Sequence, residues 1–227
     1  MHHLQMDRKK LSSISVYAPN TEKPMLNECC PNLKILFLQD NYLTSVGFAF
    51  QGLKNVTQIN LFNNFITDMD CFEDCVNLRK LYMEHNRISK LSGLQNCQRL
   101  EELYLGNQQI GNIEFSFDDY SLAAISNTLV VLDLPVVNLV ECKPIYFLER
   151  LNTLNLADNR IADFEEQVSP MLMTLQSLNK LSLINNPVTK NTHKYRDQVV
   201  ILTRGQFTDL DGKTIKMQER QYLAQLH

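Results

Sequence analysis

The sequence predicts an α/β solenoid, with a parallel sheet on its concave face and 3₁₀ or short α-helical segments on its convex face. Three observations support this prediction. Apolar residues recur with a period of 22 or 23 residues through most of the chain, each period has the same internal spacing, and that spacing changes halfway through the period. The 227 residues are 44% hydrophobic and 21% charged, so the chain can form a packed core and is not disordered by composition.

The first half of each period has the spacing L-x-x-L-x-L-x-x-N-x-L. In the first clear unit these positions are Leu33, Leu36, Leu38, Asn41 and Leu43. The L-x-L segment predicts a short strand with alternate residues pointing inward, and the Asn predicts a turn in which its side chain bonds neighbouring backbone groups. Six further clear units begin at Val56, Leu78, Leu100, Leu129, Leu151 and Leu178.

The second half of each period has apolar residues at every third position, as in Ile88, Leu91 and Leu94. Spacing of three suits 3₁₀ or short helical turns on the convex side. Two units are longer than the others, and their extra residues predict α-helical turns within Asp118 to Asn127 and within Glu165 to Ser177.

Both ends of the chain depart from the period. A degraded eighth unit is predicted at Leu11, Ile14 and Val16, where Pro19 and Thr21 replace the later consensus residues. A stacked array exposes apolar edges at its ends and needs terminal caps. The predicted organisation is a tail or weak cap at 1–10, repeats at 11–188 and a C-terminal cap at 189–227.

Within the predicted cap, Phe207 and Leu210 are expected to cover the last strand of the repeats. Asp211-Gly212 is a turn signal, and Lys213 to Leu226 predicts a helix because it lacks internal Pro and Gly. Elsewhere, Gln108 and Val137 stand at Asn positions and Pro135 lies in a strand region, so the turns around the fifth clear unit are expected to be loosened.

These motifs resemble the short, 22-residue class of leucine-rich-repeat proteins typified by the repeat regulator of type 1 protein phosphatase. The resemblance covers residues 11–188, and the cap extends it through Asn186-Pro187-Val188, Lys194-Tyr195-Arg196 and the run from Phe207 to Lys213. The segments 117–134 and 195–223 look most like the testis branch of this class, which is described as a regulatory subunit of phosphatase-1.

The resemblance implies a non-catalytic adaptor that binds a protein, with type 1 phosphatase, tubulin, and axonemal or centrosomal proteins as the implied partners. It also implies a cytoplasmic location at the cytoskeleton, centrosome or cilium, and leaves the nucleus open. The alternative is a component of an RNA–protein particle similar to the spliceosomal leucine-rich-repeat protein A-prime, which acts by holding another protein.

Charge and hydropathy argue against direct binding to nucleic acid or membrane. The formal net charge of -3 lacks the strongly basic balance that phosphate neutralisation requires. No stretch approaches the roughly 18 apolar residues that span a bilayer, and the first ten residues lack the apolar core of a signal peptide.

The sequence contains no pattern typical of catalysis, so neither an enzyme activity nor a cofactor is predicted. Its histidines form no metal-binding spacing, and no phosphate-binding glycine pattern occurs. Cys30, Cys75, Cys97 and Cys142 occupy apolar positions of the period and are predicted to be buried, reduced thiols. A zinc site that includes Cys71 and Cys75 is the less favoured alternative.

Lys34-Ile35-Leu36-Phe37 resembles a short motif with which many regulators dock on phosphatase-1. Two interpretations are open: a docking segment, or an ordinary repeat strand in which Leu36 faces the core. The second is favoured because motif docking normally adds a free extended strand to the partner.

The residues that alternate with the buried strand leucines predict the concave surface. Aromatic and charged side chains cluster there around the second to fourth clear units, a composition typical of a protein-binding hot spot. The alternative is that aromatic residues simply favour strands. The predicted binding residues are Phe37, Phe62, Tyr82, Glu84, His85, Glu102 and Tyr104.

Overall fold

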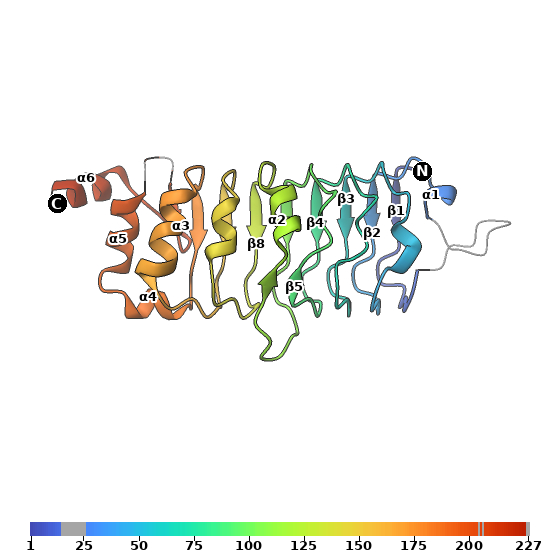
Figure 1. The fold of residues 1–227 in the computed structure, drawn as a ribbon, viewed down its shortest axis with the longest axis horizontal. Coiled ribbons are helices and arrows are strands. Elements are labelled where there is room, and N and C mark those ends of the chain that lie inside the picture. Colours follow the sequence, from blue (N-terminus) through green and yellow to red (C-terminus); the bar gives the residue numbers. More distant parts are fainter. Residues whose placement is uncertain (15–25, 204, 206, 226–227) are drawn as a thin grey trace.

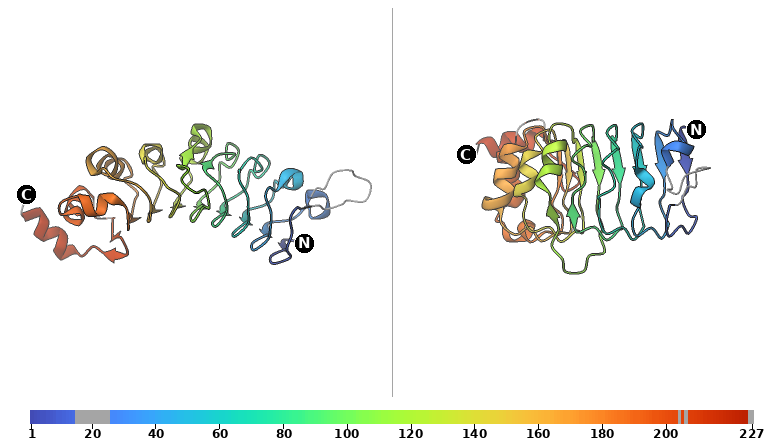
Figure 2. Two further views of the ribbon diagram at one scale, coloured as in Figure 1. Left: turned by 90° about the horizontal axis from the view of Figure 1, so that it is seen from below. Right: turned by 45° about the vertical axis from the view of Figure 1, so that its right-hand side comes forward.

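The computed structural model describes residues 1–14, 26–203, 205 and 207–225. These residues form a curved stack of units, with strands side by side along one face and helical segments along the other (Figure 1). Figure 2 shows the curvature and places the two ends of the chain at opposite ends of the stack. The predicted α/β solenoid is confirmed.

Ten strands of the described residues form one sheet, in the order β1-β2-β3-β4-β6-β8-β9-β10-β11-β12. All neighbouring pairs are parallel except β11 and β12. Two further strands, β5 (Lys90–Leu91) and β7 (Ser116–Phe117), form a separate parallel pair. The strands of the main sheet are β1 (His3–Gln5), β2 (Ile35–Phe37), β3 (Gln58–Asn60), β4 (Lys80–Tyr82), β6 (Glu102–Tyr104), β8 (Val131–Asp133), β9 (Thr153–Asn155), β10 (Lys180–Ser182), β11 (Asp209–Leu210) and β12 (Lys213–Thr214).

The strand register confirms the alignment of the seven clear units. The middle residue of each strand pairs with the middle residue of the next, for example Ile59 with Leu81 and Leu81 with Leu103. These side chains are fully buried, so each strand contributes one apolar residue to a core that runs the length of the stack. The backbone of β2 pairs with β1 on one side and β3 on the other, which confirms the repeat-strand interpretation of residues 34–37.

The predicted position of the first unit was wrong. Its strand is β1, in which Leu4 pairs with Leu36, rather than a segment at Leu11 and Ile14. Arg8 adopts φ 54°, as the residue before the turn does in later units, so residues 1–10 form a strand and a turn and are not a tail. A separation of 32 residues between Leu4 and Leu36 hides this unit from a search for a 22-residue period. The parts of the expectation that rest on Val16, Pro19 and Thr21 lie outside the described residues.

Helical segments cover the convex side, and the two longer units contain the predicted extra turns. α2 (Asp119–Ile125) lies in one of them, and a π-helical segment, η3 (Phe164–Val168), leads into α3 (Ser169–Thr174) in the other. Asp118 caps α2 by accepting a hydrogen bond from the Ser121 backbone N–H at 2.9 Å. The shorter segments are α1 (Leu26–Cys29), η1 (Gly47–Phe50) and η2 (Lys143–Phe147).

A ladder of buried amide side chains fixes the turns that follow the strands. Asn86 donates to the carbonyl oxygens of Leu61 in the preceding unit and Met83 in its own, both at 3.0 Å. Its Oδ1 accepts from the Ile66 backbone N–H at 3.0 Å. One side chain therefore joins two units and pairs backbone groups that would otherwise be buried without partners.

The expected loosening at Gln108 was wrong, because this residue makes the same contacts as Asn. Its amide donates to Met83 O at 2.9 Å and Leu105 O at 2.8 Å, and it accepts from Ile88 N at 2.9 Å. Val137 has no side-chain amide, so the turn at Val137 lacks the side-chain donors that amide residues supply elsewhere in the ladder. It is still joined to the next unit, because its backbone N–H donates to Asn159 Oδ1 at 3.1 Å.

Pro135 also fits without loosening the sheet. Inter-strand hydrogen bonds run from Leu134 N and Val136 N to the next unit, at 2.8 and 3.1 Å, so the nitrogen of Pro135 lies outside this pattern. Its ring packs over Gly106, where an added Cβ would come within 2.5 Å of Pro135 Cδ. The missing side chain of Gly106 makes room for the proline of the next strand.

The C-terminal segment closes the stack with α4 (Pro187–Asn191), α5 (Tyr195–Leu202), the β11–β12 hairpin and α6 (Met217–Gln225). Phe207 and Leu210 are buried, as expected for residues that cover the last strand, and Leu210 pairs with Leu181. Asp211 and Gly212 both have positive φ and form the predicted turn. The predicted helix begins later than expected, because Lys213 and Thr214 pair with β11; its predicted last residue lies outside the described residues.

Candidate functional site

The centre of the concave face carries a pair of stacked tyrosines. Tyr82 on β4 and Tyr104 on β6 are paired in the register of the sheet. Their ring centroids are 4.7 Å apart and their planes differ by 6°. Both residues are half-buried, so the pair presents a preorganised aromatic surface with little rotamer freedom left to lose on binding. We call this feature the tyrosine stack.

A charged pair holds the tyrosine stack from one side. Glu102 Oε1 lies 2.8 Å from Lys80 Nζ, and Glu102 Oε2 accepts a hydrogen bond from the Tyr104 hydroxyl at 3.2 Å. Burial, followed by the nearby Glu102 charge, raises the pKa of Tyr104. Lys80 was not among the predicted residues. The signal was present, because Lys80 and Glu102 occupy the same position in successive units with opposite charge.

Glu84 lies beside the tyrosine stack in an unfavourable environment for a carboxylate. Its Oε2 is enclosed and has no hydrogen-bond partner among the described residues. Burial raises the pKa of Glu84 to about 7, and the charge of Asp133 adds to this shift. A cation supplied by a bound partner would stabilise the ionised form.

Phe62 and His85 extend the aromatic surface. Their rings meet edge to face, with centroids 5.0 Å apart and an interplanar angle of 69°. His85 adopts φ 56°, which turns the chain after β4 and places the imidazole against the phenyl ring of the preceding unit. The structure thus places these two predicted residues in contact.

Phe37 is separated from the tyrosine stack. It pairs with Asn60, which in turn pairs with Tyr82, so one polar strand position lies between them. The column becomes polar beyond Tyr104, where Asn155 donates to Asp133 Oδ1 at 2.7 Å. The aromatic side chains of this surface therefore lie in the units where the sequence predicted them, whereas the binding role of the residues stays a prediction.

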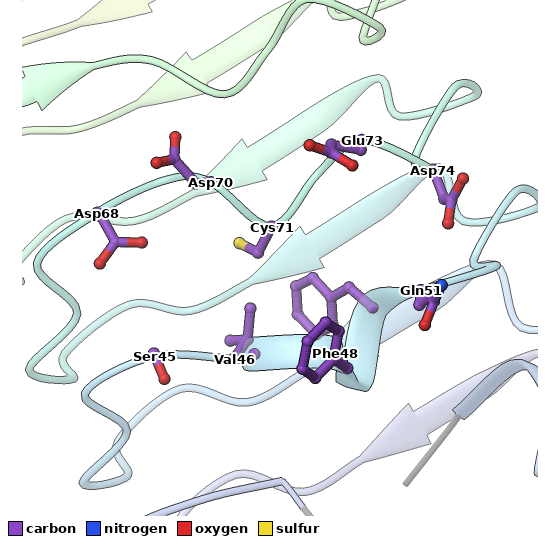
Figure 3. Close-up of a pocket in the computed structure, with 11 residues that line it drawn as sticks. Ser45, Val46, Phe48, Gln51, Asp68, Asp70, Cys71, Glu73 and Asp74 are labelled. Carbon is purple, nitrogen blue, oxygen red and sulfur yellow. The ribbon is translucent and has the colours of Figure 1, made fainter. Parts of the chain in front are cut away.

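A hollow of about 400 Å³ on the convex side has a different character. It lies between η1 and the segment 68–74, with Val46 and Phe48 on one side and four carboxylates along the other (Figure 3). Asp74 uses one carboxylate oxygen to accept from Gly52 N at 2.8 Å. The carboxylates are Asp68, Asp70, Glu73 and Asp74.

The thiols of the described residues are free, and burial suppresses their ionisation. Cys75, Cys97 and Cys142 are buried as predicted, whereas Cys30 is only half-buried. Burial raises the pKa of Cys97 and of Cys142 to about 12, and raises that of Cys71 well above its usual value. Thiols with such pKa values are poor nucleophiles at neutral pH. No group of three or more His, Cys, Asp or Glu side chains in the described ranges is arranged to hold a metal ion.

Comparisons with known proteins agree with this architecture. Residues 31–88 match the family described as "Leucine rich repeat", and residues 76–117 match "Leucine Rich repeats (2 copies)". The matched residues, 31–117, contain leucine-rich repeats, and the chain has the fold of a leucine-rich-repeat solenoid. Domains of this kind generally mediate protein–protein interactions and are typically not enzymes.

Solved structures show the same fold at low identity. An internalin C2 from Listeria monocytogenes is 24% identical, with a TM-score of 0.57 over 78% of this chain and 72% of that one. An internalin F from the same organism is 21% identical, with a TM-score of 0.61 over 96% of this chain and 59% of that one. The Drosophila Toll–Spätzle complex contains a chain that is 19% identical, with a TM-score of 0.56 over 68% of this chain and 22% of that one.

These likenesses support the fold alone. Among the described residues, no helix has the length and apolar character needed to cross a membrane.

Proposed function

We propose that the concave face binds a protein partner through the tyrosine stack and the acidic side chains beside it, and that the protein acts as a non-catalytic adaptor. The observation that supports this most directly is the 4.7 Å stacking of two half-buried tyrosines on a sheet whose backbone is fully paired at that point. Aromatic side chains that are already ordered contribute binding area at low entropic cost.

The chemistry of the surface favours a partner that presents a cationic side chain. A guanidinium or ammonium group can stack on a tyrosine ring while it pairs with a carboxylate. Glu84 and Asp133 offer such carboxylates, and burial raises the pKa of both. Binding of a cation should lower the pKa of Glu84 and release a proton, so affinity should increase as the pH rises from about 6 to about 8.

Within this role, we propose type 1 protein phosphatase, tubulin, or axonemal and centrosomal proteins as partners, in the cytoplasm at the cytoskeleton, centrosome or cilium. The support is the resemblance of the repeats and cap to the phosphatase-regulator class, with the segments 117–134 and 195–223 most similar to its testis branch. The alternative is a spliceosomal A-prime-like role in an RNA–protein particle, which the same repeat class supports.

Direct binding to purified type 1 phosphatase and tubulin tests the concave site. The Tyr82→Ala/Tyr104→Ala variant should bind the physiological partner with an affinity reduced about tenfold or more, because truncation of a hot-spot aromatic typically costs about 2 kcal/mol of binding free energy. The matched control is Tyr120→Ala/Tyr222→Ala, which removes two tyrosines that are 78% and 63% exposed outside the concave face.

Both variants should retain the circular dichroism spectrum and the unfolding midpoint of a folded solenoid. Equal binding by the two folded double variants would exclude the concave site. Binding of neither protein to the unmodified chain would reject these partners and leave the spliceosomal alternative to be tested by copurification with particle components.

A further inference from the structure

A second hollow lies on the flank of the solenoid, at the edge where the central strands begin. It has a volume of about 300 Å³. Arg79, Glu101 and Val130, which directly precede β4, β6 and β8, line it together with residues from the loops before those strands and β9. The complete lining is Arg79, Arg99, Glu101, Thr128, Val130 and Arg150.

The hollow is strongly cationic. Three guanidinium groups and one carboxylate line it, which gives a local net charge of +2 in a chain whose formal net charge is -3. The carboxylate of Glu101 is already paired with Arg79. Arg99 and Arg150 therefore face the hollow without a carboxylate partner in the described part of the chain.

These two guanidiniums have unused donor capacity. Arg99 Nη1 donates to Asn77 Oδ1 at 2.8 Å, and Arg150 Nη1 donates to Asn127 O at 3.3 Å. Each guanidinium has five N–H groups, of which one donates a hydrogen bond to the protein. Most of their donors are available to a ligand.

The bonds of these arginines to the preceding unit use one N–H of each side chain. Arg99 and Arg150 each occupy the position just before the first leucine of a unit. The same position is filled by Asn77 in the unit that begins at Leu78 and by Thr128 in the unit that begins at Leu129. Asn77 links its unit to the preceding one with a single hydrogen bond to Lys54 O at 2.8 Å. Arg150 makes the corresponding bond with one N–H and brings a positive charge that this link does not require.

The arrangement matches a doubly charged oxyanion. Strands of a sheet lie about 4.8 Å apart, so the backbone positions of Arg99 and Arg150, two units apart, are separated by about 10 Å. Their side chains can therefore approach a ligand in the hollow from two sides. Guanidinium forks bind phosphate oxygens in a bidentate manner, and the phosphoryl group of a phosphorylated side chain carries about -1.5 to -2 charges at neutral pH. We propose that this hollow binds the phosphomonoester group of a phosphorylated serine or threonine on a protein partner.

A nucleic-acid backbone fits the hollow less well. It would require a row of cations that neutralises successive phosphates, whereas two of the three guanidinium groups that line the hollow lack a carboxylate partner among the described residues and the third, Arg79, is paired with Glu101. Val130 provides an apolar wall for the methylene group of a phosphorylated side chain. The inference concerns the flank of the solenoid and does not depend on the proposed concave site.

The test is a titration of the full chain with inorganic phosphate and with an acetylated, amidated Gly-phosphoserine-Gly peptide, followed by NMR chemical shifts and calorimetry. The Arg99→Gln/Arg150→Gln variant should lower the affinity for both probes about tenfold or more, because two charge-assisted contacts are lost. The matched control, Arg87→Gln/Arg160→Gln, removes the same charge from exposed residues away from the hollow and should bind as the unmodified chain does.

Further measurements distinguish specific binding of a phosphomonoester at the hollow from general attraction between opposite charges. Affinity for the phosphoserine peptide should fall as the pH is lowered through about 6, where its phosphoryl group loses the second charge, whereas affinity for sulfate should not follow this change. Absence of saturable binding, equal affinity in the two folded double variants, or tighter binding of a single-stranded oligonucleotide than of the phosphopeptide would each overturn the proposal.

Discussion

The buried amide ladder makes a sharp prediction at Asn86, because the chain itself contains two natural replacements at equivalent positions. Gln108 keeps the hydrogen bonds of the ladder, and Val137 gives up the side-chain donors. Asn86→Val should therefore destabilise the protein strongly, whereas Asn86→Gln should be tolerated.

The expected magnitude follows from the contacts of a side chain that is 0% exposed. Asn86→Val removes the bonds to Leu61 O, Met83 O and Ile66 N, each 3.0 Å long in the native protein. Each hydrogen bond contributes about 1 kcal/mol, and a buried polar group without a partner costs about 1–3 kcal/mol, so the unfolding free energy should fall by about 3–5 kcal/mol. Asn86→Gln adds one methylene group and should cost less than about 1.5 kcal/mol.

Urea denaturation followed by circular dichroism and tyrosine fluorescence measures both changes. The valine variant should show a much lower midpoint, and the glutamine variant a midpoint near that of the unmodified chain. Equal midpoints for all three proteins, or a glutamine variant as unstable as the valine variant, would refute the role assigned to the ladder.

Three further predictions concern single residues. Val136 is 44% exposed and adopts φ 55°, a conformation that is unfavourable for a β-branched side chain. The substitution Val136→Asn should therefore stabilise the fold by about 1 kcal/mol. An unchanged or lower thermal midpoint would contradict this prediction. The pKa of Glu84 is raised to about 7 from an unfolded value near 4.5, so its ionisation lowers stability as the pH rises between these values. Glu84→Gln should match the unmodified chain near pH 4 and exceed it by on the order of 1 kcal/mol above pH 7, after discounting for solvent screening, as measured by denaturation at both pH values. Cys29 is exposed, whereas the pKa values of buried Cys97 and Cys142 are raised to about 12, so a thiol reagent under native conditions should modify Cys29 well before them, with mass spectrometry locating the adduct.

The sequence by itself determined the solenoid and its register. Each strand needs one inward apolar residue, and most turns carry an amide side chain that bonds backbone groups, so these features repeat locally from unit to unit. Period-two alternation also determined which side chains face the concave surface, including Tyr82 and Tyr104. The first strand escaped prediction because its spacing from Leu36 is 32 residues, although Leu4 meets the same requirement.

Tertiary structure alone decided how side chains of different units combine. Pro135 is accommodated because Gly106 on the neighbouring strand has no side chain, and a period in the sequence does not reveal this pairing of shapes. Whether two tyrosines stack, whether a Glu84 oxygen is left without a partner, and whether Arg99 and Arg150 share one hollow all depend on curvature and on rotamers set by neighbouring units. Local sequence specifies the direction of each side chain, whereas packing between units specifies the environment that its charge and shape experience.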